Sequence, residues 1–216
     1  MGQDDGRPDE RPAHEVFVSA FRMAVHPVTN AQYREFMGAA GYPAPRFCDD
    51  ARFNAADQPV VGVTWANAVA YCDWLGASAG ARFRLPTEAE REKAARGGLA
   101  GRLYPLGDDA GADGGRFEQS APYPVCRSEP NGYGLYDMAY NVHEWCSDWY
   151  GAAYYAVSPA RDPAGPPSGT RRASRGGAWR HQVKLNRCAA RSSLPPSFEY
   201  NDYGFRVARD VAPDEA

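Results

Sequence analysis

Residues 131–144 carry the most architectural information in this chain, and they read Asn131-Gly132-Tyr133-Gly134-Leu135-Tyr136-Asp137-Met138-Ala139-Tyr140-Asn141-Val142-His143-Glu144. Gly132 and Gly134 adopt positive φ without steric cost, so the first four residues predict a turn. The rest is a compact segment with two carboxylates, Asp137 and Glu144. Carboxylates and backbone carbonyls supply the oxygen ligands that Ca²⁺ prefers. The composition therefore indicates a calcium loop; the alternative is that both carboxylates only cap turns.

The segments that follow predict short strands separated by loops. Residues 144–150 alternate large and polar side chains, which is typical of a half-buried strand. The runs 175–179 and 204–208 predict two more short strands, and these enclose a long excursion. Regions rich in Gly, Pro, Asp or Ala predict loops over 102–120 and 162–170.

Upstream, three short helices are predicted from their capping residues. They cover 29–38, 64–76 and 87–97, and each begins at a threonine and ends at or near a glycine. The third has a thin apolar face, with Arg91 and Lys93 where apolar bulk is expected.

Composition limits the function classes. The chain has 216 residues with 22 Gly and 18 Pro and no long helical period, so one domain over 1–216 with sparse secondary structure is expected. With a net charge of −3, the chain lacks the excess of basic residues that binds nucleic acid, so nucleic acid is not expected as a partner. No segment is long and apolar enough to act as a membrane span, and residues 1–12 lack the apolar core of a signal peptide. Five cysteines without a CxxC pair favour a reducing cytoplasm.

At this point nearly the whole chain resembles the formylglycine-generating-enzyme (sulfatase-modifying-factor) superfamily. The resemblance is carried, in the family's order, by His26-Pro27-Val28-Thr29-Asn30, Gly62-Val63-Thr64-Trp65, Arg84-Leu85-Pro86-Thr87-Glu88-Ala89-Glu90, Asn131-Gly132-Tyr133-Gly134-Leu135-Tyr136-Asp137-Met138, Arg175-Gly176-Gly177, Arg187-Cys188-Ala189-Ala190-Arg191 and Gly204-Phe205-Arg206. It implies an α+β, variant C-type-lectin-like fold with low regular secondary structure and long ordered loops.

The family's chemistry is copper-assisted oxidation of a substrate cysteine to formylglycine, and two enzyme cysteines bind the copper because Cu(I) prefers thiolates. In the family they lie between a Gly-Gly-Ser strand and the Arg-Cys-Ala-Ala-Arg segment. Here that interval, residues 178–186, contains no cysteine and is shorter. We therefore expect no copper and no formylglycine formation. His181 falls near the first missing cysteine, but a lone histidine more often makes hydrogen bonds, and His143 has the same interpretation.

The resemblance also implies the details of metal and disulfide content. In the family's calcium loop the ligands correspond to the side chains of Asp137 and Glu144 and the carbonyls of Tyr140 and Val142. The family's other calcium loop, expected around 111–117, is rearranged, so one calcium ion is predicted. Cys72 and Cys188 resemble half-cystines of secretory members whose partners fall at Ala95 and Val207, so both are predicted to be unpaired.

Two functions follow as hypotheses. The first is a calcium-stabilised module that binds a protein or peptide through the 179–203 excursion, with the candidate contact residues Trp179, Arg180, His181, Tyr200, Asn201, Asp202 and Tyr203. The aromatic residues among them can instead belong to the core, and this interpretation is favoured for Trp179. A special form is a retroelement-diversified variable protein, since such proteins vary the residues before a closing Gly-Phe-Arg. The alternative is a divergent oxidoreductase with a non-cysteine active site, acting in natural-product or protein modification. The sequence shows no catalytic constellation that selects it.

Overall fold

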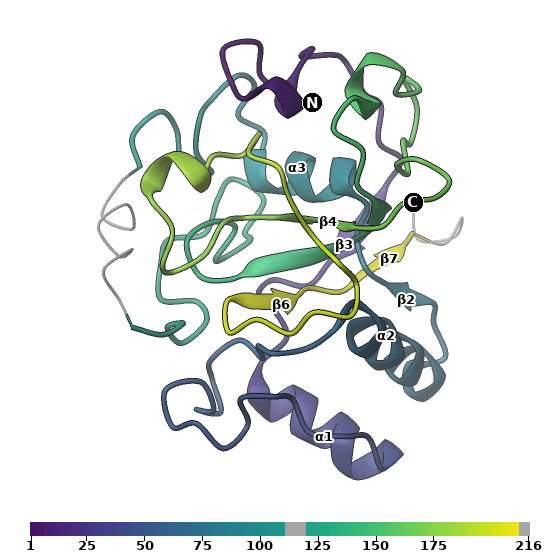
Figure 1. The fold of residues 1–216 in the computed structure, drawn as a ribbon, viewed down its shortest axis with the longest axis vertical. Coiled ribbons are helices and arrows are strands. Elements are labelled where there is room, and N and C mark those ends of the chain that lie inside the picture. The colour runs from purple at the N-terminus through teal and green to yellow at the C-terminus, as the bar shows by residue number, and fades with distance from the viewer. Residues whose placement is uncertain (111–119, 212–216) are drawn as a thin grey trace.

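The computed structural model describes residues 1–110 and 120–211 (Figure 1). Its α-helices are α1 (Asn30–Ala40), α2 (Trp65–Ala79) and α3 (Glu88–Arg96). Its strands are β1 (Phe21–Met23), β2 (Phe83–Arg84), β3 (His143–Trp149), β4 (Arg172–Arg175), β5 (Ser192–Leu194), β6 (Tyr203–Phe205) and β7 (Ala208–Asp210). Short 3₁₀ turns lie at Pro8–Glu10, Tyr154–Ala156 and Val183–Leu185. Most of the described chain is thus ordered loop, as the sequence predicts.

The strands form two small sheets. One has the order β1-β7-β2, with antiparallel pairing throughout. The other has the order β5-β4-β3-β6, and its β3–β6 pair is parallel, with His143 opposite Tyr203. Figure 1 shows α3 on one side of the four-stranded sheet and α1 and α2 toward the other side. This parallel pair joins the start of β3 to the end of the 179–203 excursion.

The helix starts agree with the sequence, and two of the ends do not. Thr29, Thr64 and Thr87 are N-caps, each within a capping box. The third helix ends at Gly97 as predicted, but α1 runs on to a left-handed Gly41 and α2 to a left-handed Gly80. Gly76, the expected stop of α2, lies inside the helix, where a Cβ would come 2.8 Å from the carbonyl oxygen of Ala81. It is glycine because the chain approaches closely there, not because the helix ends.

The strand predictions need three corrections. The strand expected over 144–150 is β3, but its first four residues are all buried, because β4 and β6 flank it within the sheet and α3 packs on it. The run 175–179 is not a strand, since β4 ends at Arg175 and Gly176 and Gly177 adopt positive φ. The run 204–208 is divided between β6 and β7, which belong to different sheets.

The apolar core lies between α1, α2 and the sheets. Tyr33, Phe36, Tyr71, Trp145 and Phe205 are among its fully or almost fully buried members. Several of these aromatic rings meet edge-to-face, including Tyr33 with Phe36 at 5.3 Å between centroids. Cys72 belongs to this cluster, whereas Cys188 lies in a separate one with Ala94, Ala95, Leu135 and Met138. All five cysteines are free, in agreement with the predicted loss of both disulfides.

α3 is held by buried ion pairs, and this explains its thin apolar face. Glu88 accepts hydrogen bonds from Arg191 at 2.7 and 2.8 Å and from Arg175 at 3.0 Å. Arg175 also donates to Glu92 at 2.9 Å. Arg191 further donates to the carbonyl of Asp9 at 2.7 Å. No helix among the described residues is long and apolar enough to cross a bilayer.

Candidate functional site

The seven predicted contact residues divide into exposed and buried groups. Trp179, Asp202 and Tyr203 are buried, with exposed fractions of 7%, 1% and 5%. The Trp179 indole donates to the carbonyl of Asn201 at 3.4 Å. Arg180 and Tyr200 are exposed, and His181 and Asn201 are intermediate. The three buried residues therefore support the surface from below and offer little contact area themselves.

Phe198 is a surface residue that the sequence reasoning missed. It is 45% exposed, and its ring contacts Tyr200 at 6.0 Å between centroids. Arg180, His181, Phe198 and Tyr200 together are called the excursion surface below. A Phe flanked by Pro and polar residues carries no periodic signal, so sequence alone did not distinguish it from a core residue.

Two histidines and an aspartate meet at the excursion surface, and one of them, His181, belongs to both groups. His143 is the first residue of β3, His181 lies in the loop after β4, and Asp202 directly precedes β6. His143 Nε2 and His181 Nδ1 are 3.0 Å apart, and His181 Nε2 lies 3.6 Å from Asp202 Oδ2. One ligand-type atom from each residue lies within 4.8 Å of the others. We call these three residues the His-His-Asp cluster.

The cluster is electrostatically unusual because it is buried next to cations. Burial, followed by the charges of His181, Arg180 and Arg91, holds the pKa of His143 well below its ordinary value. Burial also lowers the pKa of His181, although the neighbouring Asp202 opposes that shift. Arg180 donates to Asp202 at 2.8 Å. Both imidazoles are therefore neutral at physiological pH, the form in which histidine coordinates metals or acts as a base.

Asp137, in the predicted calcium loop, has a strained backbone conformation and a hydrogen-bonded carboxylate. It adopts φ 55°, and Tyr140 adopts φ 73°. The Asp137 carboxylate accepts from the Cys126 amide at 2.8 Å and from the Ser128 hydroxyl at 3.3 Å. Burial raises the pKa of Asp137 above its ordinary value.

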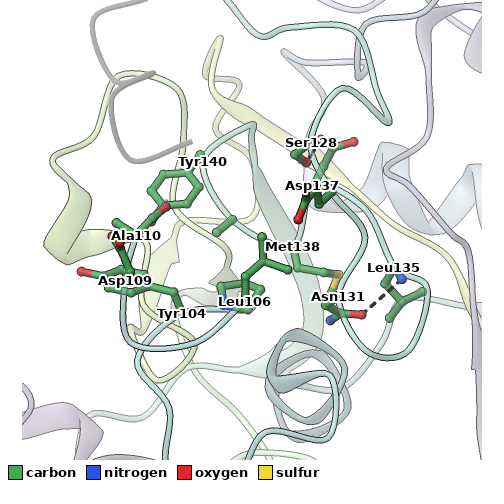
Figure 2. Close-up of a pocket in the computed structure, with 13 residues that line it drawn as sticks. Tyr104, Leu106, Asp109, Ala110, Ser128, Asn131, Leu135, Asp137, Met138 and Tyr140 are labelled. Carbon is green, nitrogen blue, oxygen red and sulfur yellow. Dashed lines mark hydrogen bonds between the residues drawn. The ribbon is translucent and has the colours of Figure 1, made fainter. Parts of the chain in front are cut away.

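Asp137 also lines a small cavity of about 30 Å³. Figure 2 shows Tyr104 and Tyr140 on one side of this cavity and Asp137 and Asn131 on the other. The cavity has room for about one or two water molecules.

Glu144 has partners that the sequence did not reveal. Arg91 donates to it at 2.7 Å, and Arg206 donates to both of its oxygens at 3.0 to 3.3 Å. Arg91 also donates to the carbonyl of Met138 at 2.9 Å, inside the loop itself. Burial alone would raise the pKa of Glu144, but Arg206 and Arg91 hold it below its ordinary value. A calcium ion at this loop would have to share Glu144 with two guanidinium groups.

Calcium binding by Asp137, Tyr140, Val142 and Glu144 stays a prediction, and the region expected to replace the other calcium loop, 111–117, lies outside the described residues. Arg91, which the sequence places where apolar bulk is expected, is fully buried and donates to Glu144.

The fold and these sites define a class of protein: a mixed α and β domain of the variant C-type-lectin type, with three described helices, two small sheets and long ordered loops. The model of the sulfatase-modifying factor enzyme 1-like domain matches residues 1–211, and the chain belongs to this family.

Relatives confirm the membership. The chain is 36% identical to the formylglycine-generating enzyme of Streptomyces coelicolor, over 94% of this chain and 82% of that enzyme. It is 38% identical to the serine/threonine-protein kinase pkn1 of Chlamydia caviae, over 97% of this chain but 36% of the kinase. The chain thus spans little more than a third of that relative's length. Among solved structures it resembles Treponema denticola variable protein 1, with a TM-score of 0.82, 27% identity and coverage of 96% of this chain and 90% of that one.

Proposed function

We propose that this domain is a binding module that recognises a protein or peptide through the excursion surface, and that it does not form formylglycine. The observation that carries the proposal is the exposure of two aromatic rings that contact each other, Phe198 and Tyr200, and of the Arg180 side chain, all on irregular backbone of the same excursion. Tyrosine and arginine are frequent hot-spot residues because they supply large or directional contacts.

The surface is preorganised by the buried residues below it. The Tyr200 ring lies 6.3 Å from the Tyr203 ring, and Tyr203 lies 4.7 Å from His143 and 5.1 Å from Trp145. The Tyr203 hydroxyl is hydrogen-bonded with Ser192 at 3.1 Å. A surface fixed before binding loses less conformational entropy when the ligand arrives, which favours affinity.

Similarity to a variable protein supports the same proposal. Treponema denticola variable protein 1 shares this fold at 27% identity. By this analogy, the proposal extends to retroelement-driven diversification of residues 179–203. A reverse transcriptase gene with a matching template repeat nearby in the genome would support that form, and a genome without either would remove it.

The binding proposal is tested by selection from a random peptide library. The parent protein should enrich peptides, and the triple variant Arg180→Ala/Phe198→Ala/Tyr200→Ala should lose them. The expected loss in affinity exceeds about tenfold, because one hot-spot residue contributes about 2 kcal/mol. His181 is left unchanged so that the His-His-Asp cluster stays intact.

The matched control is Phe17→Ala/Tyr133→Ala, which removes two aromatic rings that are each 53% exposed and belong to other segments. The control should bind like the parent. Equal binding by the parent and the triple variant would show that the excursion surface is not the recognition site.

A divergent oxidoreductase with a non-cysteine active site is the second candidate, and the His-His-Asp cluster is the observation that favours it. The test is to incubate a small-molecule extract with dioxygen and either the parent or His181→Ala. Mass spectrometry should then reveal oxidised products that only the parent forms. Identical product profiles would remove this candidate.

A further inference from the structure

The His-His-Asp cluster is assembled by the backbone and not by a local motif. Because β3 and β6 pair in parallel, the amide of His143 donates to the carbonyl of Asp202 at 2.8 Å. That bond holds the backbone of two of the three residues side by side, one at the start of β3 and the other directly before β6. The third, His181, follows the positive-φ pair Gly176 and Gly177 and reaches the cluster from the loop.

The spacing of the nitrogens is close to that of two ligands of one ion. Imidazole nitrogens bind transition metals at about 2.0–2.1 Å, so two such ligands in a tetrahedral site lie about 3.3 Å apart. His143 Nε2 and His181 Nδ1 are 3.0 Å apart. In the metal-free protein one of these nitrogens must donate a proton to the other. If a cation takes the place of this proton, the two rings have to move only slightly apart, from 3.0 Å to about 3.3 Å between the nitrogens.

Two buried atoms of the cluster are left without partners. His143 Nδ1 and Asp202 Oδ1 have no hydrogen-bond partner, although their residues are only 4% and 1% exposed. An unsatisfied buried polar group is costly, so Asp202 Oδ1 is a candidate ligand atom. His143 Nδ1 is on the other side of the ring from Nε2 and cannot bind the same ion. Arg180 occupies only Asp202 Oδ2, so the other carboxylate oxygen is available.

The cluster also has an entry path. The side chain of His181 is 27% exposed, whereas that of Asp202 is 1% exposed. Arg180, whose side chain is 43% exposed, can move into solvent when a cation neutralises Asp202. An ion would therefore arrive beside His181 and would keep open positions on that side.

We propose that His143, His181 and Asp202 bind one divalent transition-metal ion, Zn(II) or Fe(II). Two imidazoles and one carboxylate are ligands that both ions accept in sites with open positions. Calcium prefers ligand sets made entirely of oxygen, and Cu(I) prefers thiolates, so neither matches this set. The ligand set differs from that of the predicted calcium loop, although His143 lies between Val142 and Glu144 in the chain. The metal proposal does not rest on the binding function proposed above.

The test is direct metal titration of the full chain after chelation and dialysis. Zn²⁺ is titrated by calorimetry, and Co²⁺ is added anaerobically as a spectroscopic probe of coordination by nitrogen and oxygen. The parent should bind one equivalent of each. His181→Ala and Asp202→Asn should each lose at least about tenfold in affinity while keeping the parent's circular dichroism. Fe²⁺ titrated in competition with Zn²⁺ under anaerobic conditions shows which of the two ions the site prefers.

The chain has only four histidines, which provides matched controls. His14→Ala and His26→Ala remove the other two, both partly exposed, and should bind metal like the parent. The proposal is overturned if the parent binds no metal, if His181→Ala and Asp202→Asn bind as tightly as the parent, or if affinity is lost in the control variants instead.

Discussion

Replacing Arg91 by alanine should destabilise the domain strongly, although the sequence places this residue on a thin helix face. Arg91 and Glu144 are both fully buried, and Arg91 Nε lies 2.7 Å from Glu144 Oε2. Removing one member of a buried ion pair costs about 3–5 kcal/mol, because the remaining charge loses its partner. Arg206 still contacts both oxygens of Glu144, so we expect the lower limit, about 3 kcal/mol.

For a chain of this size, 1 kcal/mol corresponds to a shift of about 2–4 °C in Tm, so Arg91→Ala should melt about 6–12 °C below the parent. Differential scanning calorimetry measures the Tm, and urea denaturation measures the free energy of unfolding. Lys93→Ala is the control on the same helix. Lys93 is exposed and donates only to the carbonyl of Val18, so its loss should change stability by less than about 1 kcal/mol. A Tm for Arg91→Ala within about 2 °C of the parent would refute the reasoning.

The other predictions concern oxidation, calcium and pH. Incubated with Cu(I), dioxygen and a peptide carrying a sulfatase-type cysteine, the protein should form no formylglycine, and aldehyde in excess of the enzyme would contradict this. If the predicted loop binds calcium, a chelator should lower the Tm of the parent and Asp137→Ala should abolish that difference; metal-free protein with an unchanged melting curve would eliminate the site. Burial, followed by the charge of Glu88, raises the pKa of Asp148 to about 7 from the ordinary 3.8. The folded state then binds this proton more tightly than the unfolded state, so Asp148 costs stability as the pH rises from about 4 to about 7. The free energy of unfolding of Asp148→Asn, measured relative to the parent, should therefore be higher at about pH 8 than at about pH 4. If the difference between variant and parent is the same at both pH values, the pKa of Asp148 is not raised.

The helix starts could be predicted because capping is local. Each N-cap threonine and its partner three residues on are visible in the sequence. The helix ends were harder, since a glycine such as Gly76 serves either as a stop or as a point of close approach. Only the tertiary structure separates these two roles.

The candidate sites could not be predicted for the same reason, because their residues lie far apart in the sequence and meet only in the tertiary structure. His143 and His181 are 38 residues apart, and the His-His-Asp cluster depends on the parallel pairing of β3 with β6. No spacing rule predicts that pairing. The partner of Arg91 was not predictable for a related reason: Glu144 is 53 residues away, so the sequence shows a charge at an apolar position without showing what neutralises it.

The position of β7 has a consequence for biosynthesis. This strand, Ala208–Asp210, lies between β1 and β2, so residues made late form the middle of a sheet whose edges come from residues 21–23 and 83–84. β6 likewise joins β3 only after residue 205 has been made. Because chains emerge from the ribosome in order, the four-stranded sheet stays incomplete until residue 205 has left the exit tunnel, and the three-stranded sheet until residue 210 has left it. Until then, α1 and α2 expose the aromatic side chains that are buried in the finished domain. At this stage of synthesis the chain is most prone to aggregate and to bind chaperones.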